Sequence, residues 1–337
     1  MPSGSFRQVG VPQLHPPPWR RWCRTSANEK PGDALIVVTY MDGKWLKDED
    51  ATVSVRSRAL NYGMGCFGGV RGYLADDENE VFIFRLDAHV RRLEQSAKVL
   101  YLKVPATTEL VNIHLELVRR NNVHHDVYLR PLLIHNSDKL APILDEDSTS
   151  FICYSMPLKR YIDKDMIDTC VSSWRRVRDN AIPTRTKPTG AYLNSALARR
   201  EAHDNGFDEA IFLTEEGRVS EGSAEHVFIV RGGKLISPPS TQDNLDGITR
   251  RSIITMAQED LGIPFEQREI GRSELYVSEE MFLCGTGAQI TPVRTVDRRT
   301  IGAGKIGPVT QKLAKYFDDV VHGRVQKRLS WLSPVWG

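Results

Sequence analysis

The chain has 337 residues, of which 40% are hydrophobic and 26% are charged, with a net charge of +2. This composition is typical of a soluble globular protein, and the length is sufficient for two domains with separate cores. The small net charge gives no indication of a nucleic-acid-binding surface, and the sequence has no apolar run of about 18 residues that would predict a membrane span.

The first 33 residues differ in composition from the rest. They are rich in proline and arginine, and their first acidic residue is Glu29. Proline interrupts amphipathic helices, and the segment lacks the apolar stretch of a secretory signal. We expect residues 1–33 to be a disordered extension, or to follow from a start codon assigned too far upstream, in preference to a transit peptide.

The five cysteines are scattered and odd in number, and no two of them form a CxxC pair: Cys23, Cys66, Cys153, Cys170 and Cys284. This pattern favours neither a disulfide framework nor a zinc site. We therefore expect no metal, and a reducing compartment, the cytoplasm.

The first predicted element is a hairpin over residues 35–46, because two apolar runs flank Asp42-Gly43, a strong turn signal. Asp87 is a plausible N-cap for a helix with apolar residues at helical spacing up to Leu100. Further along, the pattern predicts a helix over 109–122 and strands over 127–135 and 150–157.

The stretch Pro157–Asp165 is charged and lacks periodicity, which is typical of a linker. We predict a small N-terminal α/β domain over 34–156, the linker over 157–165 and a large C-terminal domain over 166–337.

In the second half, helices and strands again alternate. Gly206 and Gly262 each follow a helical pattern, as C-terminal glycines often do. The predicted strands are 168–174, 208–213, 224–230 and 279–285, and the predicted helices are 191–205, 249–261 and 307–321. This mixture indicates an α/β or α+β fold with two domains.

Arg130 lies in the strand 127–135, where Tyr128 and Arg130 share one face and Leu129 lies on the other. A guanidinium among apolar residues needs a partner, and its fork fits a carboxylate. A substrate carboxylate and an internal salt bridge explain this residue equally well.

Two glycine-containing turns are candidate anion sites. Gly247 precedes a helix that begins with Ile248 and Thr249, whose free N–H groups suit a phosphate. Taken alone, this stretch favours Thr249 as a simple cap. The turn Gly285–Gly287 after a strand is a second, weaker candidate.

Three more charged residues are candidates for a role in binding or catalysis. Glu221 lies among small residues that would let a ring approach closely, and Arg92 follows Arg91 on a helix, where one of two adjacent arginines usually points inward. Lys187, in "IPTRTKPTGAYLNS", would be nucleophilic if it were desolvated or near positive charge. Taken alone, that stretch favours a solvated loop lysine.

Four segments in this order, "TKPTGAYLNS", "RVSEGSAEHVFIV", "LDGITRRSII" and "CGTGAQITPVRTVD", resemble the branched-chain amino-acid aminotransferases. These are fold-type IV pyridoxal-phosphate enzymes. The resemblance covers roughly residues 38–335 and includes "RALNYGMGCFGGVRGY", "FRLDAHVRRLEQSAKVL" and "VYLRPLL". It implies a small α/β domain and a larger, β-barrel-like α/β domain.

The resemblance also implies roles for individual residues. Lys187 matches the lysine that forms the Schiff base with pyridoxal phosphate and moves the proton between Cα and C4′. Glu221 matches the carboxylate that pairs with the pyridinium nitrogen, which makes the ring a better electron sink. Tyr192 matches the tyrosine that binds the phenolic oxygen. The residues that match the phosphate site are Arg92, Ile248, Thr249 and Thr286.

The substrate pocket follows from the same resemblance. Its matching residues are Tyr62, Phe67, Tyr128, Arg130, Thr286, Gly287 and Ala288, with Phe67 as an apolar wall. The implied reaction is transamination between Leu, Ile or Val and 2-oxoglutarate, which gives a branched 2-oxo acid and L-glutamate. The family implies a homodimer in which each pocket receives parts from both subunits.

Three positions depart from the family pattern. Gly68 replaces a usual Glu, which predicts a roomier and less polar pocket wall, while His226 replaces Asn and Gln289 replaces Glu. These changes leave open a fold-type IV transaminase for D-amino acids or (R)-amines, or an aminodeoxychorismate lyase.

Overall fold

The computed structural model describes residues 37–158 and 164–337. Residues 37–337 are assigned to one compact unit. The predicted N-terminal extension, Cys23 and most of the predicted linker lie outside the described residues. The division into two domains stays a prediction.

The first of two sheets has eight strands in the order β17-β5-β4-β6-β7-β1-β2, with β3 also paired to β6. All of its pairings are antiparallel. Its strands are β1 (Val38–Met41), β2 (Lys44–Lys47), β3 (Gly65–Phe67), β4 (Val70–Leu74), β5 (Val81–Phe84), β6 (Val127–His135), β7 (Thr149–Pro157) and β17 (Leu332–Pro334). The last strand of the chain therefore returns to the sheet built from its first half.

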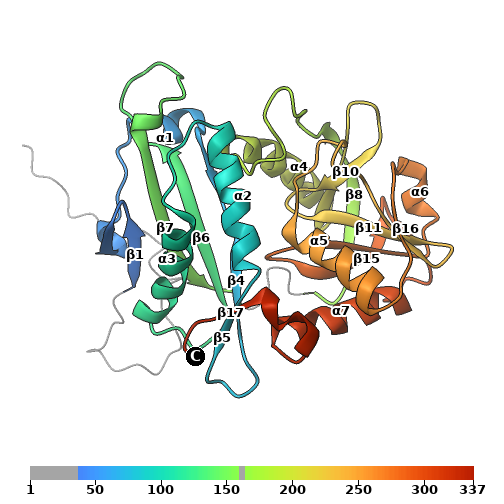
Figure 1. The fold of residues 1–337 in the computed structure, drawn as a ribbon. Helices are drawn as coiled ribbons and strands as arrows, with labels where there is room; N and C mark the ends of the chain where they lie inside the picture. Colours follow the sequence, from blue (N-terminus) through green and yellow to red (C-terminus); the bar gives the residue numbers. More distant parts are fainter. Residues whose placement is uncertain (1–36, 159–163) are drawn as a thin grey trace, which may run out of the picture. The chain divides into compact units, whose positions relative to one another are not determined.

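Two helices, α2 (Leu86–Val99) and α3 (Thr107–Arg120), lie along this sheet (Figure 1). Val90 of α2 and Leu117 of α3 are buried in one core with Leu129 of β6. Apolar residues at helical spacing meet alternate strand residues in this core, which is why the sequence pattern predicts both elements.

The hairpin predicted around Asp42-Gly43 is confirmed as β1 and β2. Asp42 has φ +48° and Gly43 has φ +83°, the left-handed pair that a two-residue hairpin turn requires. The N-cap predicted at Asp87 is wrong, because α2 begins at Leu86 and Arg85 is its N-cap. Asp87 lies in the first turn of the helix, where the helix dipole favours a carboxylate.

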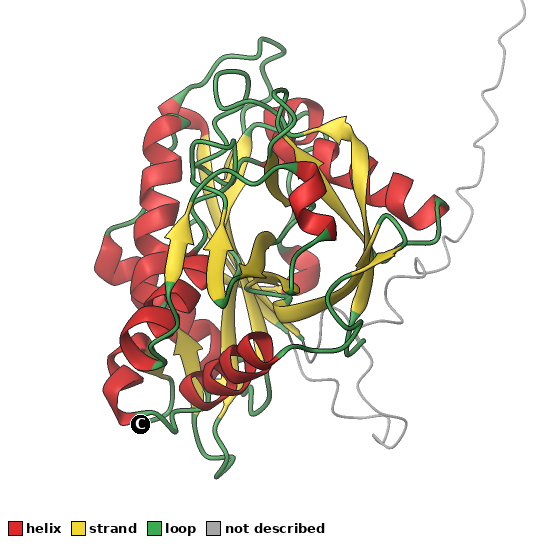
Figure 2. Ribbon diagram, turned by 90° about the vertical axis from the view of Figure 1, so that its right-hand side faces the viewer, coloured by secondary structure: helices red, strands yellow, loops and turns green. Residues whose placement is uncertain are grey.

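The second sheet has nine strands in the order β10-β9-β8-β15-β14-β11-β12-β13, with β16 also paired to β15. It curls around part of the core, as Figure 2 shows, and it mixes parallel and antiparallel pairs. Its strands are β8 (Ile167–Arg175), β9 (Glu209–Leu213), β10 (Val219–Gly222), β11 (His226–Arg231), β12 (Lys234–Ser237), β13 (Phe265–Gln267), β14 (Glu280–Gly285), β15 (Gln289–Val296) and β16 (Arg299–Thr300).

The helices of the second half pack against this sheet. Ala198 of α4 packs on Phe212 of β9, while Ile253 of α5 and Leu313 of α7 share a core with Phe228 of β11. These helices are α4 (Tyr192–Asp204), α5 (Ile248–Thr255), α6 (Arg272–Tyr276) and α7 (Pro308–Val321). Among the described helices, none has the length and apolar character needed to cross a membrane.

Shorter helical segments complete the described structure. The helix predicted over 249–261 continues beyond α5 as one π-helical segment, Met256–Asp260, and the chain leaves it at Gly262 with φ +63°. The remaining segments are α1 (Arg58–Tyr62) and the 3₁₀ turns Asp48–Asp50, Glu146–Ser148, Thr189–Ala191 and Gln326–Trp331.

Candidate active site

The backbone around Lys187 is tied to the first sheet. The Lys187 carbonyl accepts a hydrogen bond from the Phe67 N–H at 3.0 Å. The hydroxyl of Thr189 donates to the Gly63 carbonyl at 2.6 Å. Gly63 also touches Gly190 so closely that a Cβ on Gly63 would lie 2.8 Å from the Gly190 Cα. The lysine therefore has a short and fixed tether.

The Lys187 amine is partly buried and lies next to aromatic groups. Its Nζ donates a hydrogen bond to the Tyr192 hydroxyl, at the first residue of α4, and lies 5.1 Å from the centre of the Phe67 ring. Burial, and next the positive charge of Arg92, lower the pKa of Lys187 from 10.5 to about 8. At pH 7 roughly a tenth of the amine is therefore neutral, far more than at the ordinary pKa, and the neutral form is the one that acts as a nucleophile or base. Burial raises the pKa of Tyr192, which keeps its hydroxyl protonated.

Arg130 reaches the same place from β6. Its guanidinium carbon lies 4.4 Å from the centre of the Phe67 ring, and its Nη2 donates to the Tyr128 hydroxyl at 3.0 Å. Among the described residues no carboxylate pairs with Arg130, which favours the substrate carboxylate over the internal salt bridge without testing either. Its buried Nε also has no hydrogen-bond partner there, which leaves a desolvated donor beside Lys187.

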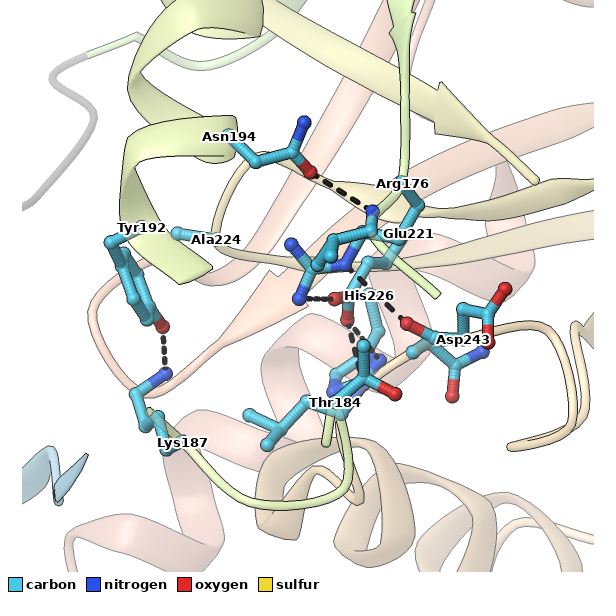
Figure 3. A network of polar contacts seen from close by, with 12 residues as sticks. Arg176, Thr184, Lys187, Tyr192, Asn194, Glu221, Ala224, His226 and Asp243 are labelled. Carbon is cyan, nitrogen blue, oxygen red and sulfur yellow. Dashed lines mark hydrogen bonds and ion pairs between the residues drawn. The ribbon is translucent and has the colours of Figure 1, made fainter. Parts of the chain in front are cut away.

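Glu221 lies at the centre of a second group of contacts, shown in Figure 3. It is 5% exposed, and its Oε1 forms an ion pair with Arg176 at 2.9 Å. Its Oε2 accepts the Leu245 N–H at 3.1 Å and lies 3.5 Å from Nδ1 of His226. Burial raises the pKa of Glu221, and the charge of Arg176 opposes that shift. These partners hold a buried carboxylate in one orientation.

Arg92 faces inward from α2, whereas Arg91 is exposed and pairs with Asp87. Nη1 of the Arg92 side chain donates a long hydrogen bond to the Asp246 carbonyl at 3.5 Å. Burial lowers the pKa of Arg92. The expectation that one of the two arginines points inward is confirmed, and the buried guanidinium lies near the start of α5.

The start of α5 has the predicted geometry. Ile248 and Thr249 are its first two residues, both are buried, and Gly247 is the N-cap without a side-chain bond to the helix. The cap role considered for Thr249 is therefore wrong, because Thr249 lies inside the first turn. The free N–H groups of this turn remain available to an anion.

The turn of Thr286, Gly287 and Ala288 connects β14 to β15. The Gly287 carbonyl accepts from Nη1 of Arg71 at 3.3 Å, and Arg71 is itself paired with Asp126 at 3.1 Å. The second half of the chain is thereby joined to the first at a predicted substrate-binding turn. Among the described residues, no hydrogen bond or ion pair connects Thr286 to Arg92.

Tyr62 is not brought into this cluster by the described contacts. It is half exposed at the end of α1, and its hydroxyl donates to the Leu140 carbonyl at 2.5 Å. Its place in a pocket stays a prediction.

The sequence predicted extra room in the pocket wall at Gly68. At the position that a Cβ of residue 68 would take, this prediction is wrong. A Cβ on Gly68 would lie 2.6 Å from Cγ of Pro131, and the Gly68 N–H donates to the Pro131 carbonyl at 2.8 Å. The Pro131 ring fills this space. The neighbouring Gly69 has a different role, since the Tyr128 hydroxyl stands 2.2 Å from where its Cβ would be.

Two functional side chains were missed by sequence reasoning. Arg176 holds Glu221, and Arg71 holds the Gly287 carbonyl. For Arg176 a signal existed, because the adjacent Arg175 and Arg176 repeat the pattern of Arg91 and Arg92, with the first exposed and the second buried.

The groups assembled here fit pyridoxal phosphate. Lys187 supplies an amine of lowered pKa, and Glu221 supplies a fixed carboxylate for a ring nitrogen. Arg92 is a buried cation whose hydrogen bond to the Asp246 carbonyl is long, and it lies next to the free N–H groups that begin at Ile248. A phosphate between them would satisfy both.

Comparisons with known proteins agree with this geometry. The family described as amino-transferase class IV matches residues 66–296. A probable branched-chain-amino-acid aminotransferase from Aquifex aeolicus is 40% identical over 88% of this chain and 96% of the relative.

Two solved structures named as branched-chain aminotransferases show the same fold. The one from Thermoproteus uzoniensis, with norvaline, has a TM-score of 0.84 and 40% identity over 89% of this chain and 99% of its own. The one from Thermobaculum terrenum, in its PLP form, has a TM-score of 0.85 and 37% identity over 90% of this chain and 99% of its own. The fold-type IV architecture predicted from the sequence is confirmed, and the chain belongs to the class IV aminotransferases.

Proposed function

We propose that this protein is a pyridoxal-phosphate-dependent transaminase that exchanges the amino group between Leu, Ile or Val and 2-oxoglutarate. The products are the branched 2-oxo acid and L-glutamate. The observation that carries the proposal is the Lys187 amine of lowered pKa, held between Tyr192 and Phe67. The names of the similar proteins support the branched-chain substrates.

Pyridoxal phosphate, when bound, would supply an electron sink for the electron pair that remains on the substrate Cα after its proton is removed. Lys187 would carry the proton between the substrate Cα and C4′ of the cofactor, and Tyr192 holds the Lys187 Nζ for this transfer. Glu221, oriented by Arg176, would keep a proton on the ring nitrogen. Arg92 and the turn from Gly247 to Thr249 would hold the phosphate.

The substrate is oriented by side chains of the first sheet and by the turn at Thr286–Ala288. Arg130 and the Tyr128 hydroxyl grip a substrate carboxylate, because the Arg130 Nε has no other partner among the described groups. Phe67 packs against an apolar side chain. A pocket with apolar walls and a few polar groups accepts both a branched side chain and that of glutamate.

We also propose that the protein is a homodimer in the cytoplasm. Each subunit would consist of a domain over 34–156 and a domain over 166–337. An exposed apolar patch supports the dimer. Its members are adjacent because Tyr62 binds the Leu140 carbonyl, Asn61 binds the Val55 carbonyl and Arg58 binds the Ile143 carbonyl. The patch consists of Val55, Leu60, Tyr62, Leu140 and Ile143.

The four described cysteines are buried and unpaired, which suits a reducing compartment.

A panel of amino donors tests the substrate class. Leu, Ile, Val, a D-amino acid and an (R)-amine are each offered with 2-oxoglutarate, and glutamate formation is followed. We expect the three branched L-amino acids to have the highest kcat/KM. A preference for the D-amino acid or the (R)-amine would assign the protein to another transaminase group. Release of pyruvate from aminodeoxychorismate without a keto acid would assign it to the lyases.

A further inference from the structure

His226, the first residue of β11, touches two parts of the site at once. It is 5% exposed and pairs across the sheet with Cys284 of β14. On one side, its Nδ1 lies 3.5 Å from Oε2 of Glu221 (Figure 3). The same Oε2 accepts the Leu245 N–H, so the ring and the chain before α5 converge on one oxygen.

On its other side, the His226 ring lies directly against Gly247. A Cβ on Gly247 would stand 2.0 Å from Nε2, 2.5 Å from Cδ2 and 3.0 Å from Cε1 of that ring. Gly247 has φ −77° and ψ 129°, a conformation open to any residue. The glycine is therefore required by the histidine that packs on it and not by the backbone.

The charge state of His226 follows from its surroundings. Burial, and next the positive charge of Arg250, lower its pKa well below 6.5, and Lys187, Arg92 and Arg176 act in the same direction. The ring is therefore neutral near neutral pH and carries one N–H. With Glu221 beside Nδ1, that N–H belongs on Nδ1, and the bare Nε2 faces the Gly247 Cα.

We propose that His226 is a positioning residue that sets the separation between the Glu221 carboxylate and the turn from Gly247 to Thr249. Under the proposed function the Glu221 carboxylate would hold the ring nitrogen of pyridoxal phosphate and the turn would hold its phosphate, so the imidazole spaces the two ends of the cofactor site. This inference rests on the proposed function.

A double-mutant cycle tests this spacing role. We expect Gly247→Ala to raise the Kd for pyridoxal phosphate at least tenfold, because the new methyl group would overlap the ring. In the His226→Ala background the methyl group has room, so adding Gly247→Ala should change the Kd less than threefold. Equal effects of Gly247→Ala in both backgrounds would overturn the inference.

Two further measurements separate positioning from simple packing. The pH midpoint of the visible absorbance of the bound cofactor should shift in His226→Ala and return toward wild type in His226→Asn, whose amide restores a donor toward Glu221. An unshifted midpoint in His226→Ala would contradict the role toward Glu221. If Gly247→Ala alone is insoluble, recovery of soluble protein in the double variant supports the spacing role, and no recovery contradicts it.

The wild-type protein distinguishes this inference from the proposed function. Absence of pyridoxal phosphate binding by wild type would remove the proposed function and, with it, this inference. Binding by wild type together with additive mutant effects would remove the role of His226 alone.

Discussion

The lowered pKa of Lys187 has two physical sources that can be tested separately. Burial removes water from its amine, and Arg92 adds positive charge nearby, so both disfavour the protonated form. At the ordinary pKa of 10.5 almost no neutral amine would exist at pH 7. The environment, and not the residue type alone, makes this lysine suitable for catalysis.

Removal of the Arg92 charge should raise the pKa of Lys187 from about 8 toward 10.5. In Arg92→Gln, the pH profile for labelling of the Lys187 amine by a neutral acylating reagent should therefore move to higher pH. The labelling is followed by mass spectrometry of the peptide that contains Lys187 in cofactor-free protein. Arg91→Gln is the matched control, because Arg91 is 59% exposed and should leave the profile unchanged. Identical profiles for the two variants would contradict the electrostatic role of Arg92.

Substitution of Gly68 should change both the stability of the protein and the range of amino donors that it accepts. Gly68→Ala places a Cβ 2.6 Å from the Pro131 ring and should cost about 1–3 kcal/mol of unfolding free energy in urea. Gly68→Glu should have the same steric cost and should also narrow the donor range. Comparison of the two variants on the donor panel separates the carboxylate from the added carbon. An unchanged donor range in Gly68→Glu would mean that Gly68 does not set specificity.

At the scale of elements, long periodic segments were predictable and short ones were not. The strand predicted over 127–135 is β6, and the helix predicted over 307–321 is α7 with one residue fewer. In contrast, β3 has three residues, too few for a period, yet its Phe67 N–H holds the Lys187 carbonyl. The sequence therefore predicted Lys187 through its family resemblance, while its tether required the structure.

The residues around Lys187 also divide into those that the sequence predicts and those that only the structure shows. Tyr128 and Arg130 share a strand face by simple alternation, and the structure confirms it. Arg176 and Glu221 form an ion pair although they are 45 positions apart in the sequence (221 − 176 = 45). A pattern within one helix or strand cannot predict a contact between residues so far apart. Local chemistry was readable from the sequence, and long-range pairing was not.

The junction of α1 with the lysine loop gives an element-scale prediction. Gly63 has φ +66°, and a Cβ there would lie 2.8 Å from the Gly190 Cα. Gly63→Ala should lower the urea unfolding free energy by about 2–4 kcal/mol, through backbone strain and overlap, and should reduce kcat. Gly43→Ala is the control, because its φ is +83° with nothing within 4 Å of the added carbon. It should lose only about 1 kcal/mol and keep its activity. Equal losses in the two variants would exclude the Gly63–Gly190 contact as a constraint.

At the scale of the whole molecule, the exposed apolar patch of Val55, Leu60, Tyr62, Leu140 and Ile143 is the basis of the proposed dimer. Leu140 is 86% exposed, although leucine is normally buried. Residues of such a patch gain free energy when a second copy covers them. Tyr62 belongs to the patch, which offers a reason why the described contacts leave it outside the cluster around Lys187.

A charge in the patch should separate the subunits. Leu140→Asp should sediment as a monomer at concentrations where the wild type is a dimer, and it should lose most transaminase activity. Val277→Asp is the control, since Val277 is 62% exposed and lies outside the patch. If Leu140→Asp remained dimeric and active, the patch would not be the subunit interface.

The most direct test of the central claim is the identity of the amine that holds the cofactor. Wild-type protein is incubated with pyridoxal phosphate, reduced with borohydride, digested and examined by mass spectrometry. We predict a pyridoxyl group on Lys187, and in Lys187→Ala we predict loss of the label, of the visible absorbance and of turnover while the circular dichroism spectrum is retained. A label on another lysine, or steady-state transamination by the folded Lys187→Ala protein, would contradict the assignment.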